Sequence, residues 1–167
     1  MIRVLNLTGN AYQIGRQHGE QVADLRPQIE NSMKIRLAEL CKNDPDLSPY
    51  IDEINGIWEQ YAPDTLDMLK GISDSLHLDW EEYFTYTIAS YLDSCLKNIT
   101  PNRGCSSWAA NGGITSDDAP ILVKNRDYHP DHRSLQCLAR IEPSSGNSFL
   151  CLTSAGSPAV FSSGINS

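Results

Sequence analysis

The sequence has no long apolar run and little positive charge. No stretch of about 18 or more consecutive apolar residues occurs in the 167 residues, so no segment has the composition of a membrane-spanning helix. Lys and Arg number 13 against 21 Asp and Glu, a formal net charge of -8. A nucleic-acid-binding protein would show a clustered basic face, so this class is disfavoured. The N-terminus also lacks the apolar core of a signal peptide, and we expect a cytoplasmic protein with no nucleic-acid or membrane partner.

Cysteine is present in an odd number, and no two cysteines are spaced as a CxxC pair. A disulfide framework or a four-cysteine zinc site is therefore disfavoured, and we expect no metal and no cofactor. Because cysteine side chains are among the most often buried, four of the five are expected to be small buried apolar residues, namely Cys41, Cys95, Cys137 and Cys151. Cys105 has a separate, chemical interpretation.

The region before residue 96 has the apolar period of α-helices, with spacings of three and four. Pro27 is expected to kink or break the first long helix. Ser48 and Pro49 form an N-cap and first-position pair for the next helix, and Pro63 should end it. The last helix is expected to run from Trp80 to Cys95.

Two glycines, Gly15 and Gly19, lie four residues apart near the start of this region. In a helix, this spacing permits another backbone to approach closely. A frayed first turn is the alternative interpretation, and the sequence leaves both open.

After residue 104 the apolar period changes to two, which is typical of strands. We predict an α+β fold in which an N-terminal helical segment is followed by an antiparallel sheet. The expected organisation is a helical region at residues 1–104 and the start of a sheet region at 105–167. Four or five strands make about one sheet with a face still to be covered, so the chain is expected to be the front part of a larger domain. The expected strands span residues 2–8, 105–110, 120–127, 136–142, 148–153 and 159–162.

We predict that the chain cleaves itself at the junction between the two regions, between Gly104 and Cys105. A thiol is a weak nucleophile without a base, and none of the four histidines stands in a recognisable nucleophile motif. Cleavage before Cys105 would free an α-amino group with a pKa of about 7.7–8.0 on the nucleophile itself. That amine can take the thiol proton directly or through one water. Gly104 would leave the scissile carbonyl unhindered.

The freed amine must be oriented, and Asp127 is the candidate carboxylate. The strands that follow Cys105 and precede Asp127 are joined by a short connection and should pair antiparallel. The start of one strand then lies beside the end of the other. This pairing would bring Cys105 close to Asp127.

Two short motifs together resemble a known family. Arg103-Gly104-Cys105-Ser106-Ser107, followed by Val123-Lys124-Asn125-Arg126-Asp127-Tyr128, is similar to the acyl-coenzyme A:6-aminopenicillanate (isopenicillin N) acyltransferase family. These proteins are N-terminal-nucleophile cysteine hydrolases, related to choloylglycine hydrolases and acid ceramidase. The glycine-rich opening around Gly9, Gly15 and Gly19 also resembles that family, as does Lys70-Gly71-Ile72-Ser73.

The resemblance implies an αββα sandwich, autocatalytic cleavage between Gly104 and Cys105, and hydrolysis or transfer of an acyl group held in a linear amide. Cys105 would be the nucleophile and Asp127 would hold its α-amino group. Lys124 stands where bile-salt-hydrolase relatives have an arginine, and lysine keeps the charge but loses the bidentate fork. Lys124, Asn125 and Arg126 are candidates for contact with substrate or support of the site. The partner would be a small acyl-amide substrate, with acyl group, amine and acceptor undetermined.

The resemblance also implies a missing part. The family's oxyanion-hole and further arginine residues would come from segments later than Ser167, so residues 1–167 alone are expected to be inactive and to need the remainder of their own domain. Loss of one oxyanion donor typically costs about 3–4 kcal/mol of transition-state stabilisation. Whether the protein forms a homo-oligomer is open.

Two alternatives remain on the residues themselves. The chain could be a non-catalytic fragment whose helical region serves as a binding or assembly module. A loop with two histidines three residues apart, His129 and His132, with Asp131 between them, is weak support for a zinc protein. Stoichiometric zinc in elemental analysis would support the zinc protein over the other two interpretations.

Overall fold

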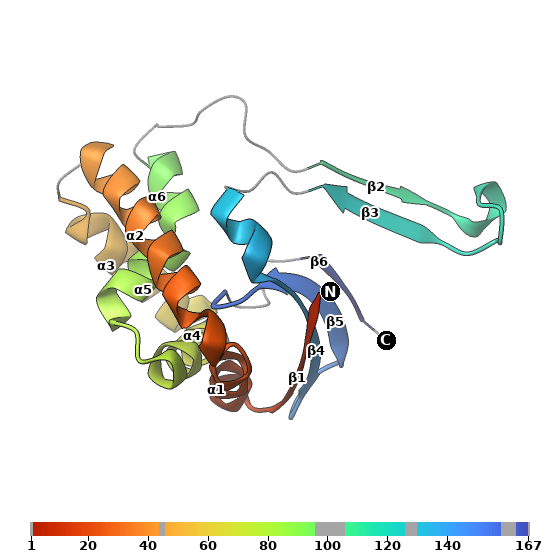
Figure 1. Ribbon diagram of the computed structural model, residues 1–167, viewed down its shortest axis with the longest axis horizontal. Helices are drawn as coiled ribbons and strands as arrows, with labels where there is room; N and C mark the ends of the chain where they lie inside the picture. The colour runs from red at the N-terminus through yellow and green to blue at the C-terminus, as the bar shows by residue number, and fades with distance from the viewer. Residues whose placement is uncertain (1, 44–45, 96–105, 126–129, 158–162, 167) are drawn as a thin grey trace. The chain divides into compact units, whose positions relative to one another are not determined.

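The computed structural model describes residues 2–43, 46–95, 106–125, 130–157 and 163–166. The chain forms two compact units, of which the larger comprises residues 1–99 with 131–167 and the smaller comprises residues 100–130. Helices and strands are both present, as the α+β prediction requires (Figure 1). In the described part of the chain no helix is long and apolar enough to cross a membrane.

The larger unit contains a four-stranded sheet in the order β1-β4-β5-β6. The strands are β1 (Arg3–Gly9), β4 (Gln136–Pro143), β5 (Phe149–Ser154) and β6 (Ser163–Asn166). β4, β5 and β6 pair antiparallel, but β1 pairs parallel to β4, with Leu5 opposite Ala139. The predicted antiparallel pairing is confirmed among β4, β5 and β6, whereas the sequence indicated no direction for β1: the helices carry the chain back so that β4 runs in the same direction as β1. The expected strand at 159–162 lies outside the described residues.

Six helices precede the second half of the sheet in the described chain. Their bounds are α1 (Ala11–Gln21), α2 (Arg26–Asn43), α3 (Ser48–Tyr61), α4 (Pro63–Leu76), α5 (Trp80–Thr87) and α6 (Ala89–Cys95). The expected break near Pro27 falls just before it, at a short 3-10 helix (Ala23–Leu25), and Pro27 lies in the first turn of α2. The single helix predicted from Trp80 to Cys95 is wrong, because the chain turns at Ile88 and forms α5 and α6.

One face of the four-stranded sheet is buried and the other is exposed. Alternate side chains of β1, β4 and β5 point into the core, including Leu5, Leu7, Ala139, Ile141 and Cys151. α1 packs against β1 and β4. On the opposite face Val4 is 54% exposed and Ile165 is 61% exposed. The sheet face that the sequence analysis expected to remain uncovered is present on this four-stranded sheet in the described residues.

The helices nearest the sheet, α1 and α4, cross at very close range. A Cβ added to Gly15 would lie 2.0 Å from the Met68 carbonyl oxygen, and one added to Gly71 would lie 2.3 Å from the Tyr12 carbonyl oxygen. The Tyr12 hydroxyl donates a 2.8 Å hydrogen bond to Asp74 across the same crossing. Of the two interpretations of the glycine pair, the close approach of another backbone is the correct one.

The smaller unit contains a two-stranded antiparallel sheet of β2 (Ser106–Ala110) and β3 (Ile121–Asn125). A 3-10 turn (Gly112–Ile114) lies in the connection, where the Asn111 side chain accepts a hydrogen bond from the Gly112 amide at 2.8 Å. β2 and β3 form a sheet of their own, so the predicted continuous meander from β2 to β5 is wrong in the described residues.

Candidate functional site

The β2–β3 hairpin is the part of the described structure next to the predicted catalytic residues. Its register pairs Ser106 with Asn125 and Trp108 with Val123. Ser106 directly follows Cys105 in the sequence, and Asn125 precedes Asp127 by two residues. The predicted antiparallel pairing of these strands is confirmed for residues 106–110 and 121–125.

The predicted site residues are only partly within the described structure. Gly104, Cys105, Arg126 and Asp127 lie outside the described residues. Lys124 and Asn125 lie at the end of β3, and both are exposed. As consecutive residues of a strand, their side chains project from opposite faces of the hairpin. A ligand bound on one face would therefore contact only one of the two.

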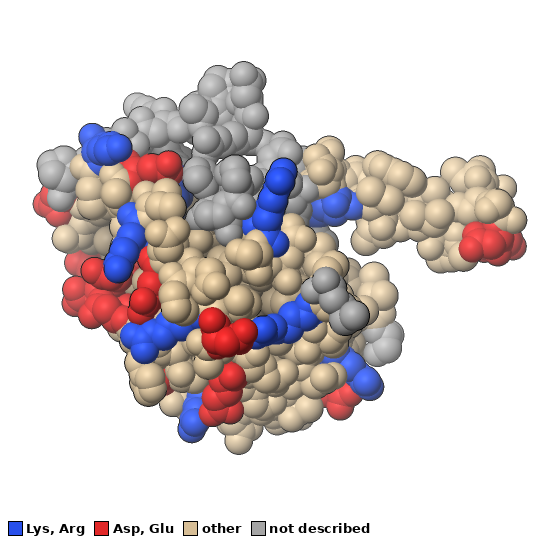
Figure 2. Space-filling view, viewed as in Figure 1, with Lys and Arg blue, Asp and Glu red and all other residues tan. Residues whose placement is uncertain are grey.

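The two faces of the hairpin differ in chemistry. Directly paired residues share a face, so Trp108, Ala110, Ile121 and Val123 form an apolar row. The other face carries Ser107 and Lys124 as a pair, and Ala109 with Leu122. Trp108 and Leu122 are each 57% exposed. Figure 2 shows the strands of the hairpin almost without charge, with acidic side chains at the tip, where Asp117 and Asp118 lie.

The remaining cysteines separate into buried and exposed thiols. Cys137 and Cys151 are buried, as predicted, and burial raises the pKa of Cys137 to about 12 and that of Cys151 to about 11. Such thiols hold almost no thiolate at neutral pH and are poor nucleophiles. Cys41 is exposed, so its predicted burial is wrong: it lies on the outer surface of α2 near the helix end. The Cys95 side chain lies outside the described set.

A buried polar cluster in the larger unit was not anticipated from the sequence. The Gly156 amide donates a 3.0 Å hydrogen bond to Nε2 of His18, and the Tyr83 hydroxyl donates one of 3.0 Å to the Gly156 carbonyl. Both peptide groups of this turn are thus held by side chains from α1 and α5. Gly156 has φ of +72°, a conformation that favours glycine. The spacing Ile14–His18–Val22, with all three residues buried, is the pattern that places His18 on the inner face of α1.

His18 must be neutral to accept that hydrogen bond. Burial lowers its pKa to about 4, and desolvation is the cause. Its Nε2 is therefore unprotonated, and the ring proton resides on Nδ1. Burial raises the pKa of Tyr83 above its ordinary range, so its hydroxyl remains a donor. The cluster is suited to holding the backbone in place rather than to proton transfer.

The histidines of the weak metal motif do not form a described metal site. Among the described residues there is no group of three or more His, Cys, Asp or Glu side chains able to hold a metal. His129 and the side chain of Asp131 lie outside them. The His132 ring stacks on Tyr86 at 6.4 Å between centroids, and the Tyr86 hydroxyl lies 3.4 Å from its Nε2.

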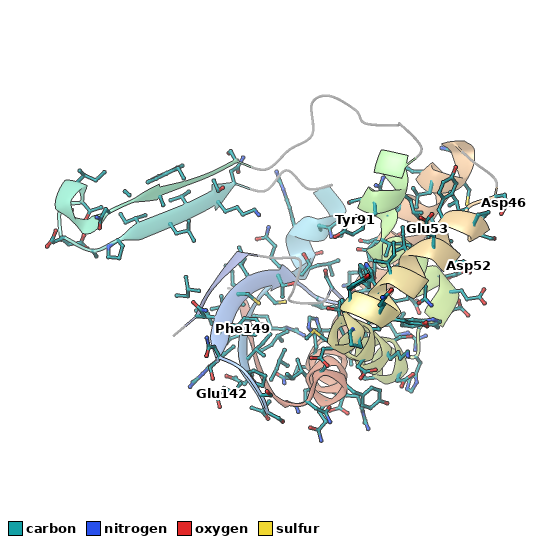
Figure 3. The ribbon with its side chains drawn as sticks, turned by 180° about the vertical axis from the view of Figure 1, so that it is seen from behind. Asp46, Asp52, Glu53, Tyr91, Glu142 and Phe149 are labelled. Atoms are coloured by element: carbon teal, nitrogen blue, oxygen red, sulfur yellow. The ribbon has the colours of Figure 1, made fainter. Side chains whose placement is uncertain are left out.

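Charged and aromatic residues gather at the helical end of the larger unit. Figure 3 shows Asp52 and Glu53 on α3 and Tyr91 on α6 at this end. Trp58 of α3 contacts Tyr91 edge-on, with ring centroids 6.3 Å apart. The two aromatic rings therefore pack α3 against α6.

A comparison with protein-family models gives no match, and no curated protein matches the sequence.

Proposed function

We propose that the protein is a cysteine N-terminal-nucleophile amidohydrolase or acyltransferase that cuts itself between Gly104 and Cys105 and then acts on a linear amide. The observation that carries this proposal is the register of the hairpin. Ser106 and Asn125 are paired at its open end, and in the sequence Cys105 directly precedes Ser106 while Asp127 comes two residues after Asn125. A nucleophile and the carboxylate that orients its amine require this kind of neighbourhood.

The chemistry proceeds through the new N-terminus. The free α-amine of Cys105 takes the thiol proton, and the thiolate attacks the amide carbonyl carbon. The C–N bond breaks, the amine leaves with the proton, and a thioester to Cys105 remains. Water then releases the acyl group as an acid, or a second amine receives it. Asp127 accepts a hydrogen bond from the α-amine and keeps it directed at the thiol.

The sheet of the larger unit supports the finer fold in this proposal. In an αββα sandwich each sheet has helices on its outer face and an apolar inner face. The four-stranded sheet has one face packed by α1, and an outer face on which Val4, Leu138, Leu152 and Ile165 lie among polar residues such as Asn6, Arg140 and Glu142. The helix-backed face is the feature that supports one half of such a sandwich.

The reaction is tested by release of free amine from a panel of N-acyl amines, using protein expressed from its complete gene. Cys105→Ala should abolish release, because the proposal makes the Cys105 thiol the nucleophile that forms the thioester. Cys41→Ala, which removes an exposed thiol from α2, is the matched control and should retain full activity. Release that survives Cys105→Ala would rule out Cys105 as the nucleophile.

A second function, an assembly module, is favoured by a different observation. Trp108, Ile114 and Leu122 of the hairpin are exposed apolar side chains, and a lone two-stranded hairpin is marginally stable in water. A module would bind a partner through this hairpin and remain uncut. The two functions are distinguished by whether the chain is cleaved.

A further inference from the structure

The free edge of β1 is covered by side chains of α1. In a parallel pair, the N–H and C=O groups of alternate residues point to the same side of the strand. The N–H and C=O groups of Asn6 and Thr8 bond to side chains of α1 and so point to the open edge, which leaves those of Leu5 and Leu7 to point toward β4. Unpaired edge groups of this kind are a template for pairing with another chain.

Two glutamine side chains satisfy these groups completely. The Gln21 side-chain oxygen accepts from the Asn6 amide at 3.1 Å, and its nitrogen donates to the Asn6 carbonyl at 2.8 Å. Gln17 does the same for Thr8, with bonds of 3.0 Å and 2.8 Å. A primary amide has the same donor and acceptor as a peptide group, so each glutamine occupies the place of a residue in a neighbouring strand.

The spacing explains why the pattern repeats. Four residues of helix advance about 6.0 Å, and two residues of strand advance about 6.6 Å. Glutamines four apart on α1 therefore keep step with alternate residues of β1. Gln13, one turn earlier on α1, has a different role: its side-chain oxygen accepts from the Asn10 amide at 3.0 Å as part of the capping box of α1. Gln17 and Gln21 are called here the glutamine ladder.

We propose that the glutamine ladder guards the β1 edge against pairing with a second copy of this chain. Two β1 strands can pair antiparallel about Asn6, in an isologous arrangement that uses the same edge twice. The exposed side chains of β1 around Asn6 are Val4 and Thr8, which are uncharged and would not repel across the two-fold axis. Arg3, the charged residue of the strand, is already paired with Asp24 at 2.6 Å. The glutamine ladder is therefore the feature that keeps this self-complementary strand edge from pairing with a second copy.

Single variants test whether each glutamine protects its own residue. Gln17→Ala should raise amide hydrogen exchange at Thr8 by about tenfold or more, and Gln21→Ala should do so at Asn6, while Leu5 and Leu7 stay protected by β4. The measurement is made on dilute monomer. Equal acceleration at all four amides would indicate general destabilisation and would overturn the proposal. Slow exchange at Asn6 and Thr8 in the unaltered protein is expected, and fast exchange there would also overturn it.

The double variant tests the second copy directly. Gln17→Ala with Gln21→Ala should produce dimers in sedimentation velocity as concentration rises over about a hundredfold range. Gln28→Ala with Gln60→Ala removes two exposed helical glutamines away from β1 and should leave the oligomeric state of the unaltered protein unchanged. A double variant that sediments like this control at every concentration would contradict the guard. If the Asn6 and Thr8 amides exchange as fast in the dimer of the double variant as in its monomer, the contact between the two copies lies elsewhere. That result would also contradict the guard.

Discussion

Burial of the His18 ring makes the stability of the larger unit depend on pH. Its pKa is about 4 in the folded protein, below the value of about 6.5 of an exposed histidine. Between these values the unfolded chain binds a proton that the folded protein does not, so stability rises with pH through this window and is lost as pH falls from about 6.5 to 4. Protonation would also replace the acceptor facing the Gly156 amide with a donor.

The pH effect is measurable by urea unfolding of the protein and of His18→Gln at pH 7 and at pH 4.5. The unaltered protein should lose about 2 kcal/mol of unfolding free energy relative to the variant between these conditions. Carboxylates that titrate in the same range act on both proteins and cancel in the comparison. The same pH dependence for both proteins would show that His18 does not titrate as assigned.

The described cysteines should differ sharply in reactivity. Cys41 is exposed, whereas burial raises the pKa values of Cys137 and Cys151. In native protein at pH 8, iodoacetamide should alkylate Cys41 and leave Cys137 and Cys151 unmodified, as read by peptide mass spectrometry. The two buried thiols should react once urea unfolds the chain. Modification of Cys137 at the rate of Cys41 in native protein would contradict its burial.

The sequence predicts the burial of single residues only in part. The general tendency of cysteine to be buried predicted Cys137 and Cys151 correctly. The exposure of Cys41 could not be predicted. The apolar period of a helix shows which residues are buried only where the helix packs against the core, and Cys41 lies in the last turn of α2, which ends at Asn43. His18 was missed because its partner, the Gly156 amide, lies 138 residues away in the sequence.

The crossing of α1 and α4 is the closest contact between elements of the larger unit. Gly15→Ala would place a methyl group against the Met68 carbonyl oxygen, a backbone atom that cannot turn away. We expect a loss of at least about 2 kcal/mol of unfolding free energy. Gly56→Ala is the matched control, because Gly56 is an exposed position of α3 with nothing within 4 Å of an added Cβ. That substitution should stabilise the protein by about 0.5–1 kcal/mol. Equal effects in thermal or urea unfolding would contradict the packing described.

Helix boundaries marked by local residues could be predicted from the sequence, whereas the pairing of strands far apart in the sequence could not. Pro63 marks the boundary between α3 and α4, as the sequence indicates, and Asp79 caps α5 through the Glu82 amide. The parallel pairing of β1 with β4 joins residues more than 130 positions apart, and no local pattern reports it. The separation of β2–β3 from the other strands is likewise a property of tertiary pairing.

For the whole molecule, the hairpin combines a confirmed structural prediction with untested chemical ones. Spacing and turn residues predicted that β2 and β3 pair, and their register confirms it for residues 106–125. The roles of Cys105 and Asp127 depend on chemistry and on a family resemblance, and they stay predictions. The helical region would then be the segment released from the front of the nucleophile, although its helices and β1 share one compact unit with β4, β5 and β6. Cleavage at Gly104 would leave the two products associated through this unit.

Intact-mass spectrometry of the denatured protein tests self-cleavage most directly. The predicted result is one species that ends at Gly104 and a second that begins at Cys105, with Cys105→Ala giving a single uncut chain. Cys41→Ala should be cut like the unaltered protein, because that thiol lies on α2. An unaltered protein that stays uncut, or a Cys105→Ala protein cut at the same bond, would contradict the assignment of Cys105 as a self-generated N-terminal nucleophile.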